Sequence, residues 1–177
     1  MGTGLTRQKL GRAFAALDAA LPRPMTLVVG GDGAMLLAHD TPTSAEDIDA
    51  YPAAGGVTVE ELDPLVKKVA KELGLPPDWL DPYYATSAHV VPADYGRRLV
   101  DVFSGDRLTV RSLGVEDLLV MKCFAGRAKD RSHARALLRR APDLRVVGSR
   151  LVELLERRVP GAAQALDLFD DLVEEAG

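Results

Sequence analysis

A short, largely apolar run that ends in two glycines is the feature that most constrains the fold of this chain. Met25–Val29 lies between Pro24 and the pair Gly30-Gly31. Such a run predicts a buried strand, the glycines predict a tight turn over residues 30–33, and residues 34–39 are expected to form a helix. Glycines let the backbone approach a ligand closely, and a helix N-terminus offers free N–H groups to phosphate. An ordinary strand-to-helix turn is the alternative interpretation.

Two aspartates follow at a spacing typical of a strand. Asp47 and Asp49 flank Ile48 in the alternating segment 47–51. On a strand, the two carboxylates lie on one face and Ile48 on the other. Neighbouring carboxylates repel each other, and a divalent cation such as Mg²⁺ removes that cost. The pair therefore indicates a metal site, and two solvated aspartates at an exposed strand end are the alternative.

A third aspartate interrupts an apolar strand pattern. Asp101 lies among Leu99, Val100, Val102 and Phe103, where a charge is costly without a partner. If this strand lies beside 47–51, Asp101 joins Asp47 and Asp49, and three carboxylates around two metal ions support phosphoryl or nucleotidyl transfer. The alternative is a carboxylate paired with an arginine such as Arg97 or Arg98.

The remaining periodicity predicts an α+β protein. Helices are expected over 5–20 and 59–73, a turn or short helix over 75–81, and strands over 88–92, 98–103 and 108–113. Further helices are expected over 115–126, 130–140, 146–159 and 162–175. We predict a small mixed sheet with flanking helices in a core over residues 1–113. A C-terminal helical region over residues 114–177 is expected to pack on that core.

Charge is distributed unevenly along the 177 residues. Residues 1–106 carry 9 Lys/Arg against 15 Asp/Glu, residues 107–158 carry 13 against 6, and residues 159–177 carry 5 acidic residues and no basic one. The basic segment is suited to phosphates of a nucleotide or nucleic acid, and solvated helix faces explain it equally well. The apolar share of 47% suits a buried core.

The cysteine and histidine content excludes several classes of protein. Cys123 is alone and His39, His89 and His133 are far apart, which argues against a disulfide framework and a zinc site. No apolar run reaches about 18 residues and the N-terminus lacks a signal-peptide pattern, so we expect no membrane span and a cytoplasmic location.

The order of these motifs resembles the nucleotidyltransferase superfamily of the polymerase-β type. More narrowly, the chain resembles the minimal bacterial nucleotidyltransferases of toxin–antitoxin systems, including the abortive-infection toxins. The narrower likeness rests on residues 74–80 (GLPPDWL), on 115–122 (VEDLLVMK), and on Arg127 with the pair Lys129-Asp130. It covers roughly residues 24–140.

The resemblance implies roles for individual residues. Gly30 and Gly31 would hold the nucleotide phosphates, and Asp47, Asp49 and Asp101 would form the catalytic, Mg²⁺-binding triad. Lys122 and Arg127 would contact the triphosphate or the acceptor. Lys122 also interrupts an apolar helix face, where a lysine needs water or an anion, and a snorkelling lysine is the alternative.

The chain departs from the family pattern at several positions. Thr43 and Ala45 occupy positions where the family often has Arg and Thr, and His133 replaces a frequent second aspartate. Asp32 adds negative charge beside the phosphate turn. These departures suggest a further hypothesis, in which a weakly catalytic protein of this fold acts as a binding or regulatory module.

The function expected from the resemblance is Mg²⁺-dependent transfer of a nucleoside monophosphate from a nucleoside triphosphate. The expected acceptor is a tRNA 3′ end or a protein hydroxyl, in a toxin that has a cognate antitoxin. Phe124 is the only aromatic residue among the basic residues of 107–158. Stacking of aromatic side chains on the bases of a single strand is therefore not indicated. Modification of a small cationic molecule such as an aminoglycoside is the alternative, because the first half of the chain is acidic.

Overall fold

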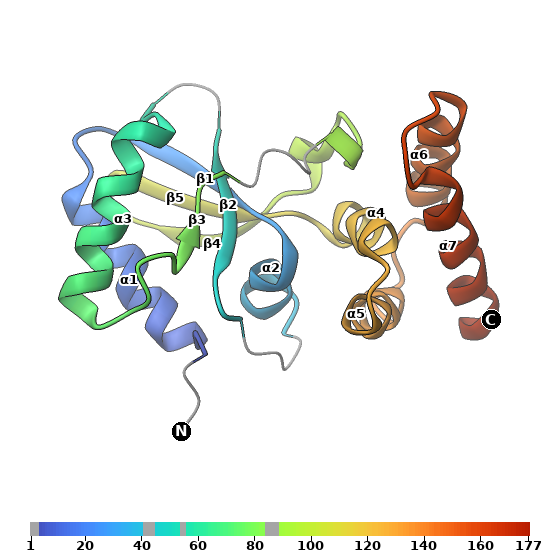
Figure 1. The fold of residues 1–177 in the computed structure, drawn as a ribbon, viewed down its shortest axis with the longest axis horizontal. Helices are drawn as coiled ribbons and strands as arrows, with labels where there is room; N and C mark the ends of the chain where they lie inside the picture. Colours follow the sequence, from blue (N-terminus) through green and yellow to red (C-terminus); the bar gives the residue numbers. More distant parts are fainter. Residues whose placement is uncertain (1–3, 41–44, 54–55, 84–88) are drawn as a thin grey trace. The chain divides into compact units, whose positions relative to one another are not determined.

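The computed structural model describes residues 4–40, 45–53, 56–83 and 89–177 of the chain (Figure 1). The fold is α+β, as the sequence predicts: a mixed sheet with flanking helices comes first, and four helices follow it. The chain divides into two compact units. The first comprises Met1–Thr86 and Leu99–Leu113, and the second comprises Ser87–Arg98 and Gly114–Gly177. The expected domains, with a boundary at residue 113 and the helices packed on the core, stay a prediction.

Within the described residues, the sheet of the first unit has five strands in the order β3-β2-β1-β5-β4. The strands are β1 (Met25–Val29), β2 (Ile48–Pro52), β3 (Leu80–Asp81), β4 (Val100–Ser104) and β5 (Leu108–Ser112). β1 pairs antiparallel with β2 and parallel with β5, while β2 and β3 run parallel and β4 and β5 antiparallel. β2 and β4 are therefore separated by two other strands.

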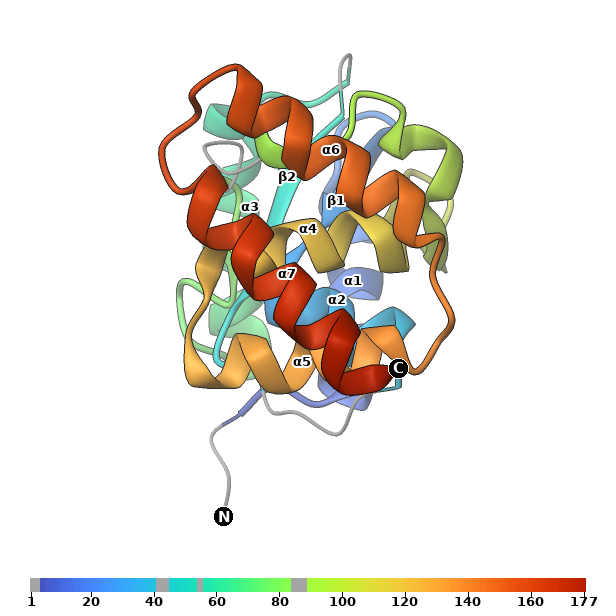
Figure 2. The same cartoon turned by 90° about the vertical axis from the view of Figure 1, so that its right-hand side faces the viewer.

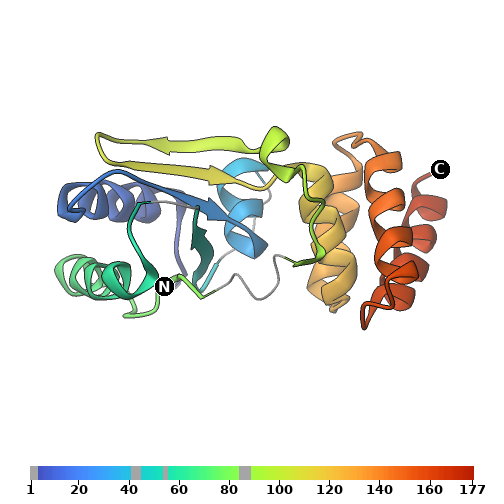
Figure 3. The same ribbon diagram turned by 90° about the horizontal axis from the view of Figure 1, so that it is seen from above.

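Helices α1 (Arg7–Ala20) and α3 (Val59–Leu73) lie side by side in the first unit (Figure 3). Phe14 of α1 is buried between two aromatic rings, with centroid distances of 6.0 Å to Trp79 and 5.8 Å to Phe103. The indole N–H of Trp79 donates to the backbone oxygen of Val66 on α3, at 3.0 Å. Trp79 thus anchors the chain immediately before β3.

Helix α2 (Gly31–Ala38) begins three residues earlier than the sequence pattern predicts. Gly33 lies within the helix, and a Cβ at this position would lie 2.8 Å from Cδ1 of Ile48 on β2. Gly33 is therefore part of a close helix–strand contact, and the tight turn is confined to Gly30 and Gly31.

The second unit consists of the short 3-10 helix η2 (Tyr95–Arg98) and helices α4 (Val115–Ala125), α5 (Ala128–Leu138), α6 (Leu144–Glu156) and α7 (Ala162–Ala176). α4 packs against α5, α6 and α7, and Figure 2 shows it behind α6 and α7. Arg98 of η2 donates two hydrogen bonds to the buried Asp117 of α4, at 3.0 and 2.8 Å.

The expected strand over 88–92 is wrong for the residues that the structure describes, 89–92. The guanidinium of Arg150 on α6 donates to the backbone oxygens of His89 and Val90, at 2.9 and 3.0 Å. A side chain therefore takes the carbonyl groups that a strand would offer to a neighbouring strand. Among the described residues, no helix is both long and apolar enough to cross a bilayer.

Candidate active site

Three carboxylates converge at one end of strands β2 and β3. Asp47 immediately precedes β2, Asp49 lies on β2, and Asp81 lies on β3 directly opposite Asp49 in the parallel pair. One carboxylate oxygen from each of the three lies within 4.8 Å of the others. Asp47 is exposed and the other two are half-buried. The cluster is open to solvent and could hold a metal ion.

The electrostatics of Asp47 reflect this crowding. The surrounding protein partly desolvates the Asp47 carboxyl and raises its pKa above the usual value, and the negative charges of Asp81, Asp78, Glu46 and Asp32 raise it further. A carboxyl surrounded by other carboxylates resists ionisation, and a bound cation relieves that repulsion. The donor set therefore suits a hard divalent cation that takes oxygen ligands.

Local structure fixes the orientation of the third carboxylate. The backbone N–H of Tyr83 donates to Oδ1 of Asp81 at 2.9 Å, and the N–H of Ile48 donates to the oxygen of Trp79 at 2.8 Å. The first contact restrains the Asp81 side chain, and the second holds the start of β3 against β2. Asp81 is consequently placed by backbone pairing and not by a flexible loop.

The Gly30-Gly31 turn lies directly against the cluster. Gly30 N–H donates to the backbone oxygen of Asp49 at 2.9 Å. Gly31 has a positive φ of 59°, and a Cβ there would lie 2.9 Å from Oδ2 of Asp49. Both the left-handed backbone and the missing side chain are therefore required for the turn to approach Asp49 this closely.

The N-terminus of α2 starts at this turn. Gly30 is its N-cap and supplies no side-chain hydrogen bond to the first turn. The first N–H groups of a helix lack intrahelical partners and favour anions. A phosphate-binding role for Gly30 and Gly31 remains a prediction, and the structure brings both residues to Asp49.

Asp101 does not join the cluster, and the expectation that its strand lies beside 47–51 is wrong. Asp101 lies on β4, an edge strand, and three strand-to-strand steps of about 4.8 Å each separate β4 from β2. Its carboxylate lies 2.9 Å from Nε of Arg111 on β5, and its side chain is 76% exposed. The alternative, a carboxylate paired with an arginine, therefore holds, with Arg111 as the partner, and the third carboxylate of the cluster is Asp81.

Lys122 and Arg127 lie in the second unit and meet at one carboxylate. Lys122 Nζ is 3.1 Å from Oδ1 of the buried Asp130, and Arg127 Nε is 2.6 Å from Oδ2. Lys122 is 3% exposed, whereas the side chain of Arg127 is 61% exposed. Lys122 is therefore a buried ion-pair residue and not a snorkelling lysine. Contact of either residue with a nucleotide stays a prediction.

The positions that depart from the family pattern have different surroundings. Thr43 lies outside the described residues. Ala45 is buried and its oxygen accepts a hydrogen bond from the N–H of Leu5, at 2.8 Å. His133 is buried on α5, and Asp32 lies in the first turn of α2, where it contributes to the raised pKa of Asp47.

Asp81 is the residue of the cluster that sequence reasoning missed. β3 is only two residues long, and the nearby Pro76 and Pro77 give the sequence before it the pattern of a turn. The available signal was Trp79-Leu80, a pair of large apolar residues directly before the aspartate. Both side chains are buried, and such a pair indicates that the next residue emerges at the edge of a core.

A mixed sheet with a glycine turn against a strand that carries Asp49 is the arrangement that the resemblance to nucleotidyltransferases leads us to expect. The family comparison agrees with this assignment. Residues 8–157 match the family model described as nucleotidyltransferase of unknown function (DUF6036), and the chain belongs to this family. No curated protein and no solved structure matches the chain significantly.

Proposed function

We propose that this nucleotidyltransferase transfers a nucleoside monophosphate from a nucleoside triphosphate to a hydroxyl group, with Mg²⁺ as its metal. The observation that carries the proposal is the convergence of Asp47, Asp49 and Asp81 beside the N-terminus of α2. In the reaction, the acceptor hydroxyl releases its proton to solvent and its oxygen forms a bond to the α-phosphorus. The bond from that phosphorus to the bridging oxygen breaks, and pyrophosphate leaves.

The residues of the cluster suit Mg²⁺, because all three offer carboxylate oxygens in a site open to water and substrate. When bound, Mg²⁺ neutralises charge on the triphosphate and lowers the pKa of the acceptor hydroxyl. We propose Asp47 and Asp49 as its principal ligands and Asp81 as the third carboxylate. The N–H groups at Gly30 and Gly31 would bind the phosphates and orient the α-phosphorus.

We further propose that the acceptor is a macromolecular hydroxyl, at a tRNA 3′ end or on a protein, and that the protein acts as the toxin of a toxin–antitoxin pair. Support comes from the resemblance over residues 24–140 and from the 13 basic residues of 107–158. A basic segment attracts the phosphate backbone of RNA independently of its sequence.

A small cationic acceptor is a second candidate, and a specific observation favours it. Asp32, Glu46 and Asp78 all lie close enough to Asp47 to raise its pKa. An excess of negative charge around the carboxylates attracts a polycation and repels a nucleic acid backbone. Growth protection by the expressed protein against an aminoglycoside would support this candidate, whereas growth arrest would support the toxin.

The test is a transfer assay with Mg²⁺ and each of four α-labelled nucleoside triphosphates. Bulk tRNA, cell lysate and a mixture of aminoglycosides serve as separate acceptors. The wild type should label one acceptor, and Asp47→Asn with Asp49→Asn should abolish labelling. Asp101→Asn is the matched control, because it removes an exposed carboxylate outside the cluster.

The outcomes of this assay separate the proposals. Label in RNA or protein supports the macromolecular acceptor, and label in the aminoglycoside fraction supports the second candidate. Absence of any transfer, together with absence of Mg²⁺-dependent nucleotide binding, would contradict the enzymatic proposal. That result would favour the non-catalytic module suggested by Thr43, Ala45 and His133.

A further inference from the structure

Helix α6 exposes an unusual share of large apolar side chains. Six such side chains are exposed among the described residues, and three of them, Leu144, Val152 and Leu155, belong to α6 with exposures of 39%, 42% and 40%. The spacing of eleven residues from 144 to 155 is close to three helical turns, and 152 and 155 are one turn apart. The three side chains therefore share one face, about 16 Å long.

This face borders α7. The adjacent face of α6 carries Val147, Leu151 and Leu154, which are buried. Gly148 lies within the exposed face, four residues from both Leu144 and Val152, and a Cβ there would lie 3.6 Å from Cε1 of Phe169 on α7. The exposed apolar stripe therefore runs along the side of α6 that neighbours α7, and Figure 2 shows the two helices next to each other.

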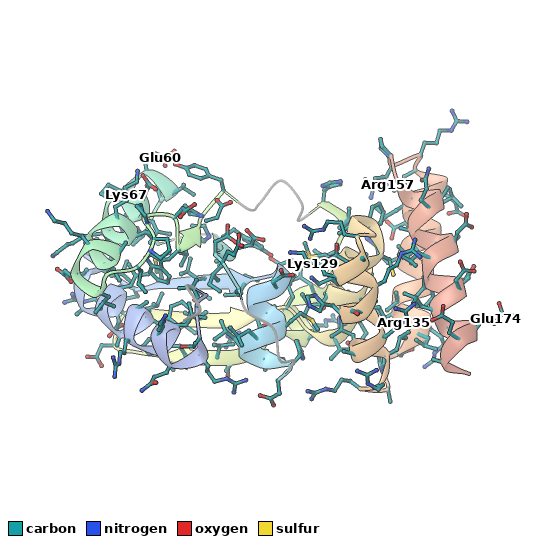
Figure 4. All side chains as sticks on the ribbon, turned by 60° about the horizontal axis from the view of Figure 1, so that its bottom comes forward. Glu60, Lys67, Lys129, Arg135, Arg157 and Glu174 are labelled. Carbon is teal, nitrogen blue, oxygen red and sulfur yellow. The ribbon has the colours of Figure 1, made fainter. Side chains whose placement is uncertain are left out.

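Helix α7, the neighbour of α6, carries negative charge. It contains no Lys or Arg and carries five acidic residues. Glu175 pairs with Arg135 at 3.0 Å. Asp167, Asp170, Asp171 and Glu174 are exposed, share one face by their spacing of three and four, and form no ion pair with any residue in the described parts of the chain. Glu174 projects from the outer side of α7 in Figure 4.

The charges of α6 do not offset this acidic row. Arg150 and Arg157 both pair with Glu153 on the same helix, at 3.0 and 3.5 Å, and Arg145 pairs with Asp143 at 3.3 Å. The basic groups of α6 are thus engaged locally, while the carboxylates of α7 face water.

We propose that this surface, defined by Leu144, Val152 and Leu155 with the acidic row of α7, binds an amphipathic helix of a partner protein whose apolar stripe is flanked by Lys and Arg. The apolar residues of the partner would cover the stripe, and its basic residues would meet the row. A second copy of the chain would bring two acidic rows together, and a nucleic acid would be repelled, so the charges favour a basic peptide. This inference does not depend on the proposed function.

The experiment measures binding of two labelled model peptides to the full chain by fluorescence anisotropy. Both are about 18 residues long, because shorter peptides form marginal helices. One contains only Leu and Lys in an amphipathic helical pattern, and the other has Glu at every Lys position. The Leu/Lys peptide should bind, and the Leu/Glu peptide should not.

Two sets of variants locate the binding. Val152→Ser with Leu155→Ser should raise the Kd of the Leu/Lys peptide about tenfold or more, a loss of about 1.4 kcal/mol. Leu73→Ser, at an equally exposed leucine of α3, should leave it unchanged. The acidic row is tested by Asp167→Asn, Asp170→Asn and Glu174→Gln together, which should also weaken binding about tenfold.

A charge-matched control guards against nonspecific attraction of the cationic peptide. Glu60→Gln, Glu72→Gln and Asp106→Asn remove the same charge from exposed positions of the first unit and should leave the Kd nearly unchanged. Equal Kd values for wild type and the Val152/Leu155 variant would overturn the proposal. The proposal would also be overturned if light scattering showed that the wild type is a dimer and that the Val152/Leu155 variant is a monomer.

Discussion

Asp49 and Asp81 are direct partners across the parallel strands β2 and β3, although 32 positions separate them in the chain. The pairing brings together Asp49, which the Asp-x-Asp pattern predicts as a site residue, and Asp81, which no sequence pattern predicts. Asp47 completes the group from the residue before β2. The cluster is therefore a product of sheet register, and its integrity depends on the residues that hold β3 against β2.

Gly31→Ala should damage both stability and activity. The new Cβ would lie 2.9 Å from Oδ2 of Asp49, in a backbone with positive φ, and such a backbone costs a non-glycine residue about 1–3 kcal/mol. Gly11→Ala is the matched control, because Gly11 lies in α1 with open space around its Cβ position. It should stabilise the protein by about 0.5–1 kcal/mol. Urea unfolding of both variants measures the contrast.

Trp79→Phe should lower the affinity for Mg²⁺, although Trp79 is not one of the proposed ligands. The substitution removes the hydrogen bond to Val66 and part of the contact with Phe14, at a cost of about 1–3 kcal/mol. Because Trp79 anchors the start of β3, we expect Asp81 to be held less firmly and Mg²⁺ affinity to fall. Unchanged Mg²⁺ affinity in a clearly destabilised variant would show that β3 does not need this anchor.

The crowded carboxylates predict how metal-free stability depends on pH. The pKa of Asp47 is raised in the folded state, so its contribution to stability is present below the usual carboxyl range and is lost as the pH rises through the raised value. Asp47→Asn should therefore have a higher Tm than the wild type at neutral pH in EDTA. The difference should shrink as the solution is acidified, and thermal denaturation across the pH range measures it. A wild type that is more stable at neutral pH would contradict the prediction.

The ion pair of the second unit gives the opposite pH dependence. Burial raises the pKa of Asp130, but the hydrogen bonds from Arg127 and Lys122 outweigh it and leave the pKa below its usual value. Its stabilising contribution is present above the usual carboxyl range and is lost as the pH falls through the lowered value. Asp130→Ala should cost about 3–5 kcal/mol at neutral pH. Arg127→Ala should cost less, because Lys122 still pairs with the buried carboxylate.

Local patterns in the sequence were sufficient for most of the fold. The glycine turn, the strand that carries Asp49, and the helices after residue 114 follow from periodicity and glycine placement, and α3 ends at Gly74 as expected. The position of Asp101 was wrong because strand pairing is not local. Even so, Gly105-Asp106 between two strand patterns is a hairpin signal, and it favours pairing of β4 with β5.

Asp81 and the segment 89–92 were missed for different physical reasons. A two-residue strand is too short to show a period, and a backbone hydrogen bond from Ile48 to Trp79 holds β3 against β2. Residues 89–92 have the apolar character of a strand, but Arg150, about 60 positions away, bonds their carbonyl groups. Both outcomes depend on tertiary contacts that propensity does not encode.

The most direct test of the central claim is Mn²⁺ binding followed by electron paramagnetic resonance, because Mn²⁺ takes the same oxygen ligands as Mg²⁺. The titration compares the wild type with Asp81→Asn and Asp101→Asn. The account predicts that Asp81→Asn weakens binding at least about tenfold, whereas Asp101→Asn leaves it unchanged. Weakened binding in Asp101→Asn, with wild-type binding in Asp81→Asn, would contradict it.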